Sequence, residues 1–366
     1  MTMRGRPESK WKILLLAGLA FGWAACAKRE EFQVTTTTER GIPVIKNSRH
    51  PRQRKASLKV TREFVLKERV DSFAVDRDGT MFVCRESAPV VKIFDAGGRA
   101  LGSFETAGPD RGELENPQIV GLTAQGELAV ESRGHGKLVF YSRDGRLLRS
   151  TSLGGINVFR LGVNSRDDLL VHLYRYVRPN MLFYLRLFDA SLNEIRTLGQ
   201  YWEPQSVGND FYAYLPILWW VIDREDRIVY GYPQRYELEI FGPDGAPRRI
   251  IRKEQTLLPI SEEEKTVYRT EYAKAPYLRL HFPAAHSAFQ KFSVDEKGWI
   301  YVLTWERTAD GKGYWYDVFD EKGYYAARIP ISRVPQLWAG GRLYTLDEEA
   351  PGEAVLVRNT FEWTER

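Results

Sequence analysis

Alternating apolar and polar positions recur along most of the chain in one repeated arrangement. Each copy is a short alternating run, a tight polar turn that often reads Asp-x-x-Gly, and a second alternating run. A period of two predicts β-strands, and Asp and Gly tolerate the left-handed backbone that tight hairpin turns need. Asp167 and Asp226 stand in the third and fourth copies where Gly stands in the first, second and fifth. The six copies cover residues 73–83, 120–130, 161–171, 220–230, 292–302 and 337–346.

A second hairpin follows each copy, and in the first five it begins with an apolar strand that ends in Phe. Two hairpins per repeat give four antiparallel strands, and four strands about every 50 residues are typical of a propeller blade. The sequence therefore predicts an all-β fold, a six-bladed β-propeller over residues 57–366. The Phe anchors, which are 46, 48, 53 and 78 residues apart, are Phe94, Phe140, Phe188, Phe241 and Phe319.

The longest of these steps contains an insertion between blades four and five, at about residues 252–290. It includes Ser261 followed three residues later by Glu264, which is a capping-box pattern, so we expect one short helix from about residue 262 to residue 273. A propeller must also close its ring, because open sheet edges pair with other chains. Residues 57–66 alternate just before blade one. We expect them to form the outermost strand of the last blade; the alternative is a loop that caps the fold.

The repeats resemble those of the NHL-repeat family of six-bladed β-propellers. Residues 73–83 with 91–98, and 292–302 with 316–323, follow its pattern of apolar-x-Val-Asp-x-x-Gly and then apolar-x-Val-Phe-Asp-x-x-Gly. The resemblance covers about residues 57–366 and departs at the turn glycine of blades three, four and six. It implies that the Asp-x-x-Gly turns lie on one face. It also implies that binding sites lie on the other face, which holds the loops between second and third strands and the crossovers between blades.

The first 25 residues have the pattern of a secretory signal: a basic start, an apolar stretch too short to span a bilayer, and small residues at the end. They lead into Trp23-Ala24-Ala25-Cys26, which resembles a bacterial lipobox. The resemblance implies a lipoprotein signal peptide at residues 1–25 and lipid attachment at Cys26, in the cell envelope on the periplasmic face or outer membrane. An ordinary signal peptide with a chance cysteine, or an uncleaved anchor, are the alternatives.

The net charge of +5 is unevenly distributed. The segment before Cys26 carries +3 and residues 27–56 carry +5, so residues 57–366 carry −3. The expected propeller is therefore not basic, and no nucleic-acid partner is implied. Residues 26–56 are predicted to be a flexible basic tether, either lying against anionic headgroups or merely solvated. Cys84 then has no intramolecular disulfide partner and is expected to be a buried thiol.

The loops expected on the binding face carry arginine beside aromatic residues. Guanidinium groups suit carboxylate, phosphate or sulfated groups, and Tyr and Trp suit stacking on sugars or peptides, although exposed loops are ordinarily charged. The crossover between blades three and four is rich in aromatic residues, which either pack on the propeller or form a binding surface. The candidate ligand-binding residues are Arg85, Arg133, Arg175, Arg235, Trp305, Arg307 and Trp202.

These patterns favour a monomeric binding or scaffold module without catalysis, for a peptide, a glycan or a partner protein. They predict no cofactor and no metal site. One alternative is a metal-dependent propeller lyase or hydrolase with its site at the central channel, where His135, His172 and His286 would have to converge. Another is a passive structural lipoprotein. Turn residues such as Asp76 and Asp295 are expected to shape the backbone.

Overall fold

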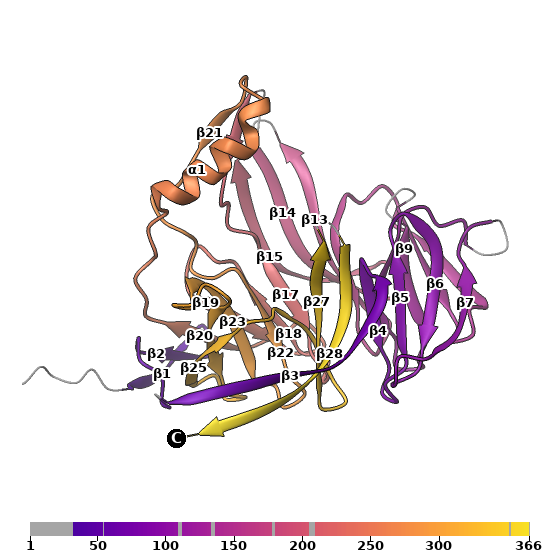
Figure 1. The fold of residues 1–366 in the computed structure, drawn as a ribbon, viewed down its shortest axis with the longest axis horizontal. Helices are drawn as coiled ribbons and strands as arrows, with labels where there is room; N and C mark the ends of the chain where they lie inside the picture. Colours follow the sequence, from indigo (N-terminus) through magenta and orange to yellow (C-terminus); the bar gives the residue numbers. More distant parts are fainter. Residues whose placement is uncertain are drawn as a thin grey trace, which may run out of the picture. The chain divides into compact units, whose positions relative to one another are not determined.

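The computed structural model describes residues 32–53, 55–108, 112–132, 136–177, 180–204, 209–350 and 353–365. The predicted signal peptide and Cys26 lie outside these residues. The described chain is almost entirely β-structure and forms a six-bladed β-propeller with one short α-helix, as the repeats predicted (Figure 1). Within it, no helix has the length and apolar character needed to cross a membrane.

The first three blades are four-stranded antiparallel sheets whose strands follow one another in chain order. Blade one contains β4 (Ser72–Val75), β5 (Met81–Arg85), β6 (Ala88–Phe94) and β7 (Ala100–Glu105). Blade two contains β8 (Pro117–Leu122), β9 (Leu128–Ser132), β10 (Lys137–Tyr141) and β11 (Leu147–Ser152). Blade three contains β12 (Val158–Val163), β13 (Leu169–Val177), β14 (Asn180–Phe188) and β15 (Glu194–Pro204).

The last three blades depart from this plan at two places, the edge of blade four and the edge of blade six. Blade four contains β17 (Trp219–Ile222), β18 (Ile228–Gly231), β19 (Glu237–Phe241) and β20 (Pro247–Lys253), and its sheet is extended by two N-terminal strands. Blade five contains β22 (Lys291–Val294), β23 (Ile300–Arg307), β24 (Tyr314–Phe319) and β25 (Tyr325–Ile331). Blade six contains β26 (Pro335–Ala339), β27 (Arg342–Ala350), β28 (Glu353–Glu365) and β3 (Ala56–Arg69).

The first strand of each blade lies at the inner edge of its sheet, facing the axis of the ring. Strand β8 contacts β4 and β12, and β22 contacts β17 and β26. The apolar core lies between neighbouring blades, where side chains from two facing sheets are buried together. One such cluster joins Phe82 and Val91 of blade one to Val130 and Tyr141 of blade two. Each sheet is thus covered on both faces, as its apolar runs require.

The ring closes as the alternating residues 57–66 predicted. Strand β3 pairs antiparallel with β28, from Ala56 opposite Glu365 to Arg69 opposite Val355. Leu58 and Leu66 of β3 are buried, at 7% and 4% exposure. The closing strand therefore joins the N-terminal part of the propeller to its C-terminus in one sheet.

The prediction of a flexible tether over residues 26–56 is wrong for residues 34–47. Strands β1 (Val34–Glu39) and β2 (Ile42–Asn47) form a hairpin, and β2 pairs in parallel with β20 at the outer edge of blade four. The hairpin forms because β-branched Thr residues favour a strand, Arg40 and Gly41 take the positive φ of a tight turn, and Val44 is fully buried. Arg252 of β20 holds the hairpin through two bonds to Glu39, at 2.6 and 2.9 Å.

Asn47, at the end of this hairpin, connects blades four and five. Its side chain is 2% exposed. Its amide nitrogen donates to the carbonyl oxygens of Gly323 at 3.0 Å and Arg252 at 3.2 Å, and its amide oxygen accepts from the backbone nitrogen of Tyr325 at 2.8 Å. All three partners are buried or partly buried backbone groups, which would be left unpaired without the side chain.

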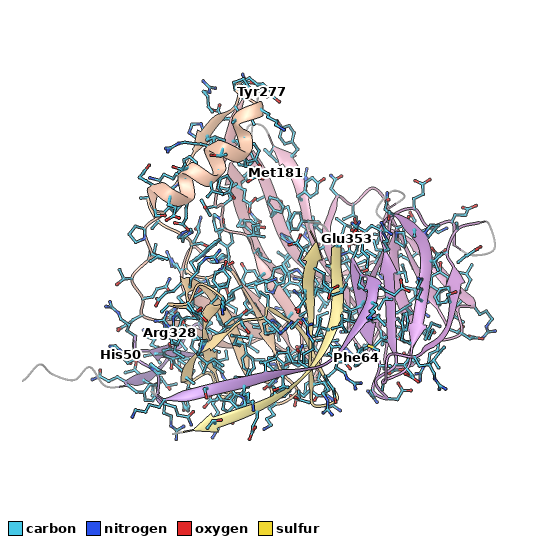
Figure 2. The ribbon with its side chains drawn as sticks, in the orientation of Figure 1. His50, Phe64, Met181, Tyr277, Arg328 and Glu353 are labelled. Atoms are coloured by element: carbon cyan, nitrogen blue, oxygen red, sulfur yellow. The ribbon has the colours of Figure 1, made fainter. Side chains whose placement is uncertain are left out.

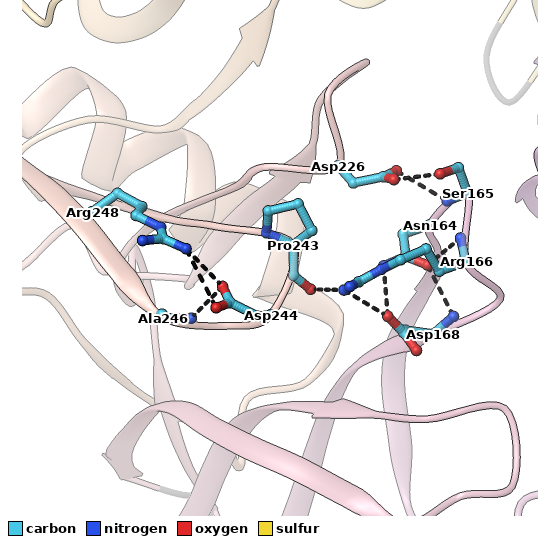
Figure 3. A network of polar contacts seen from close by, with 9 residues as sticks. All are labelled: Asn164, Ser165, Arg166, Asp168, Asp226, Pro243, Asp244, Ala246 and Arg248. Carbon is cyan, nitrogen blue, oxygen red and sulfur yellow. Dashed lines mark hydrogen bonds and ion pairs between the residues drawn. The ribbon is translucent and has the colours of Figure 1, made fainter.

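The turns that lack glycine show why aspartate replaces it. Asp167 and Asp226 have φ of 63° and 56°, the left-handed region that Asp tolerates better than most residues. Each carboxylate also bonds the preceding blade: Arg149 to Asp167 at 3.0 Å, and the backbone nitrogen of Ser165 to Asp226 at 2.9 Å. Figure 3 shows the second contact within a larger polar network, in which Arg166 reaches the carbonyl of Pro243. These turns therefore fasten one blade to the next.

Replacing Asn47 by Ala is expected to lower the free energy of unfolding by about 2–3 kcal/mol, because the change leaves buried backbone groups without partners. Urea unfolding of the purified protein measures it. The matched control is Thr36→Ala on the exposed strand β1, for which we expect a change within about 0.5 kcal/mol. Equal stability of the two variants would show that the hairpin is not a structural part of the ring.

Candidate functional site

The crossover between blades three and four meets the insertion between blades four and five. Strand β16 (Asp210–Tyr212) of the crossover pairs in parallel with β21 (Arg279–His281) of the insertion. Asp210 accepts from Arg279 at 2.8 Å and contacts His281 at 2.6 Å, and Tyr212 stacks on His281 with 4.7 Å between ring centroids. Figure 2 shows Tyr277 at the outer end of the insertion. The two connections thus form one layer over the loop face of blade four.

The helix of the insertion begins where the capping box predicted. Helix α1 (Glu262–Glu271), followed by the 3-10 helix η2 (Tyr272–Lys274), is capped by Ser261, whose hydroxyl accepts from the backbone nitrogen of Glu264 at 3.2 Å. One carboxylate oxygen of Glu264 accepts from the backbone nitrogen of Ser261 at 2.8 Å. The other lies 3.0 Å from Nε2 of His286. Burial alone raises the pKa of Glu264, but the bonds from Ser261 and His286 hold it below its usual value.

His286 is the centre of an aromatic cluster that supports the insertion. It is 1% exposed, its ring stacks on Trp305 at 4.4 Å, and the ring of Tyr214 meets it edge-on at 4.9 Å. Because a carboxylate only accepts, Nε2 of His286 carries a proton toward Glu264, and buried Nδ1 has no partner within the described residues. Tyr214 has φ of 55°, a backbone strain that its packing between rings maintains.

A pocket of about 380 Å³ opens between these segments. Its walls come from the crossover at residues 212–216, from Pro233 and Gln234 in the loop between the second and third strands of blade four, and from the insertion at Leu257 and residues 281–283 and 285–287. Most of this lining is aromatic, aliphatic or proline, with a few polar groups such as Gln234 and Ser287. A concave, mainly apolar pocket with few polar groups is the usual form of a ligand site.

Exposed apolar side chains surround this part of the molecule. Of the eleven large hydrophobic side chains that are exposed among the described residues, eight lie on the crossover, on the insertion or at the C-terminal ends of strands β13 and β15 of blade three. Concentrations of exposed apolar surface mark interaction sites more often than single exposed residues do. The eight are Tyr176, Val177, Trp202, Ile217, Leu257, Leu258, Val267 and Tyr277.

We expected the candidate arginines in the loops between second and third strands, and no contact within the described residues joins them into one site. Arg85 ends β5, Arg175 lies in β13, and Arg307 ends β23; all three are exposed. Arg235 is also exposed and directly follows Gln234 of the pocket wall. Arg133 lies outside the described residues.

The two candidate tryptophans have different positions. Trp305 lies behind the pocket, stacked on His286, with its ring nitrogen donating to Ser287 at 3.2 Å. Trp202 is 49% exposed but lies in strand β15, not in the crossover loop where we expected it. The reason is that β13, β14 and β15 are longer than the strands of blades one and two and extend toward the insertion (Figure 1).

Histidine and cysteine do not gather into a metal site in the described part of the chain, where no group of three or more metal-ligating side chains occurs. His135 lies outside that part. Buried His172 contacts the hydroxyl of Tyr201 at 2.8 Å, and burial, with a smaller effect from Arg160, lowers its pKa to about 3, so it is neutral. Cys84 is buried as expected, and burial raises the pKa of its thiol.

No known protein family profile matches the sequence, and no curated protein matches it. Among solved structures, a Bacteroides fragilis NCTC 9343 protein, assigned to export by its name alone, matches with 10% identity over 88% of this chain and 99% of that chain, with a TM-score of 0.50. A member of the DUF4221 family from Bacteroides vulgatus matches with 11% identity over 93% and 100%, with a TM-score of 0.47. Virginiamycin B lyase from Staphylococcus aureus matches with 9% identity over 84% and 99%, with a TM-score of 0.45. At these identities the likeness shows the fold alone, and membership of the NHL family stays a prediction.

Glu203, in β15 beside the candidate Trp202, lies near the hydroxyls of Tyr201 and Tyr232. Burial raises its pKa from 4.5 to about 7. The folded protein therefore binds a proton that the unfolded chain releases between these values. The stabilisation that this tighter proton binding by Glu203 gives the folded protein is complete below pH 4.5 and is lost as the pH rises through 7.

Replacing Glu203 by Gln is expected to increase the free energy of unfolding by about 1–2 kcal/mol at pH 8 and to change it little at pH 4.5. The full pKa difference corresponds to about 3 kcal/mol, which we reduce because the side chain keeps some solvent contact. Urea unfolding at both pH values measures the effect, with exposed Glu263→Gln as the control. A Glu203→Gln variant that is no more stable than the wild type at pH 8 would contradict the raised pKa.

Proposed function

We propose that the protein is a lipid-anchored propeller of the bacterial cell envelope. In this proposal it is a non-catalytic binding module that takes an apolar segment of a peptide or partner protein into the pocket under the insertion. The observation that carries the proposal is the pocket itself, open at the loop face and surrounded by exposed apolar side chains. The resemblance of the repeats predicted that this face, and not the face of the Asp-x-x-Gly turns, binds.

The lining favours a peptide over a glycan. Sugar hydroxyls need hydrogen-bond partners when they leave water, and the walls supply few. Tyr212, Phe282 and Pro283 instead offer flat apolar surface, which suits an aromatic, aliphatic or proline side chain. The amide of Gln234 can pair with a peptide backbone, and exposed Arg235 beside it can meet an acidic group of the partner.

The pocket is held ready before a ligand arrives. Glu264 fixes His286 from the helix, and Trp305 and Tyr214 enclose the same ring. A site whose walls are already ordered loses less entropy on binding. The groups that a catalytic site in the channel would need have structural roles instead. Asp295 accepts from two backbone nitrogens of its own turn, and His172 is packed and neutral.

Filling the pocket is expected to abolish peptide binding. Ala285→Trp places a large side chain in the wall, and the matched control Ser191→Trp adds the same residue at an exposed turn of blade three. The measurement is selection of peptides from a random phage-displayed library by the wild type, followed by affinities of the selected peptides for each variant. We expect peptides with a shared apolar anchor that bind the control normally and Ala285→Trp at least tenfold more weakly.

Two results would overturn the pocket proposal. One is a library from which the wild type selects no peptide. The other is a set of selected peptides that bind Ala285→Trp as tightly as they bind the wild type, which would place the binding surface elsewhere. Circular dichroism of each variant shows that the fold is retained.

The membrane attachment has its own test, because Cys26 lies outside the described residues. Cys26→Ala is expected to abolish incorporation of labelled palmitate. If the variant is still exported and cleaved, it moves from the membrane fraction to the soluble fraction. If it is not cleaved, it keeps its signal peptide and still lacks palmitate. The measurement is metabolic labelling with fractionation in a Gram-negative host. Cys84→Ala is the control, since that buried thiol is not at a cleavage site. Palmitate incorporation that persists in Cys26→Ala contradicts the lipobox assignment.

A further inference from the structure

Two cations and a tryptophan meet at the inner strands of blades three, four and five. Arg160 lies on β12, Trp219 on β17 and Lys291 on β22, the strands that face the axis of the ring. The guanidinium carbon of Arg160 is 4.2 Å from the centroid of the Trp219 ring and 4.1 Å from that of Trp220. The ammonium of Lys291 is 5.6 Å from the Trp219 ring. Both positive groups thus share one aromatic side chain.

This cluster is fixed in place by hydrogen bonds to backbone. Arg160 donates from one terminal nitrogen to the carbonyl of Trp220 at 2.9 Å. The ring nitrogen of Trp219 donates to the carbonyl of Phe292 at 2.8 Å, across to the neighbouring blade. Arg160 has five N–H donors, so most of them remain available for another acceptor.

No carboxylate within the described residues forms an ion pair with Arg160 or Lys291, although both are largely enclosed. Burial lowers the pKa of Arg160 to about 10 and lowers the pKa of Lys291, with a further lowering from Arg160. His172, opposite Arg160 in the sheet, is neutral and supplies no negative charge. Two neighbouring cations without a counter-charge destabilise a fold.

The same protein balances its other enclosed lysine. Lys253, 6% exposed at the side chain, lies 3.2 Å from the carboxylate of Asp317, which also accepts from the hydroxyl of Tyr236 at 2.8 Å. Arg160 and Lys291 therefore differ from Lys253, because the positive charge of Lys253 is paired with a carboxylate and theirs are not. Unfavourable arrangements of this kind persist most often at functional sites.

We propose that Arg160, Lys291 and Trp219 form a binding site for an oxyanion, the carboxylate, phosphate or sulfate group of a ligand, at the axis of the propeller. A guanidinium fork binds such groups through paired N–H donors, and the ammonium adds a second charge. All three residues are partly exposed to solvent, and the neighbouring Phe159 is 47% exposed, so the cluster can be approached. The site is separate from the pocket under the insertion and stands without it.

The test uses the detergent-solubilised full-length protein and three probes, namely inorganic phosphate, sulfate and succinate, each replacing chloride at constant ionic strength. We expect at least one of them to raise Tm by roughly 2–4 °C at concentrations well above its Kd, since a ligand that binds only the folded state stabilises it. Phosphate or sulfate alone would indicate a tetrahedral group, and succinate alone a carboxylate. Isothermal titration calorimetry of the active probe is expected to give one site per chain.

Lys291→Met separates specific binding from general salt effects. In chloride the variant is expected to have a Tm at or above that of the wild type, because one unbalanced charge is gone, and its Tm is expected not to respond to the probes. Lys291→Arg is expected to respond as the wild type does. Lys92→Met, which changes an exposed lysine paired with Glu68, is the control and is expected to keep the full response.

Three outcomes overturn the inference. They are a wild-type Tm that none of the probes raises, a rise of equal size in Lys291→Met, and calorimetry that detects no site in the wild type. The calorimetric result decides the matter even if Lys291→Met fails to fold. None of these measurements depends on peptide binding, so their failure and that of the pocket proposal are distinguishable.

Discussion

The pairing of β3 with β28 is the constraint on which the other features depend. Each blade buries its apolar faces only against its two neighbours, so an open ring would expose one face of the first blade and one of the last. The closing strand comes from before blade one and completes blade six, which fixes all the inner strands around one axis. Arg160 of blade three and Trp219 of blade four, which contact each other, lie on two of these inner strands. Contacts between the two ends of a chain also form at high entropic cost, so ring closure is expected to be a late step of folding.

Much of the fold follows from local pattern. The six alternating repeats gave the blades, Ser261 and Glu264 gave the start of the helix, and the alternation before blade one gave the closing strand. The N-terminal hairpin was missed because its partner, β20, is about 200 residues away and the pairing is parallel. A run of Thr with basic residues nearby is typical of a linker when read alone. Its β-branched residues, followed by Arg40-Gly41 and the apolar Val44, were the signal of a hairpin.

The candidate sites could be predicted only in part. The repeat pattern placed Arg235 and Trp305 on the loop face, and both lie next to the pocket or behind its wall. The pocket is lined by segments that lie tens of residues apart in the sequence. These segments are brought together by the pairing of β16 with β21, two strands of only three residues each, which local pattern does not predict. Arg160 and Lys291 occupy positions of inner strands where a polar residue is ordinary. Only their shared contact with Trp219, and the lack of a nearby carboxylate in the described chain, distinguishes them.

The N-terminal hairpin also sets how far the propeller can travel from a membrane. Thirty free residue steps from Cys26 to Ala56 at the start of β3 would have a contour length of about 100 Å, whereas the eight steps from Cys26 to Val34 allow at most about 27 Å. A lipid on Cys26 would therefore keep the hairpin at the edge of blade four within that distance of the bilayer surface, because β2 is paired with β20. If Cys26 carries a lipid, a partner of the propeller would therefore meet it close to the membrane. Mechanical load on such an anchor would enter at β1 and pass through the β1–β2 pair before it reaches blade four at the β2–β20 pair.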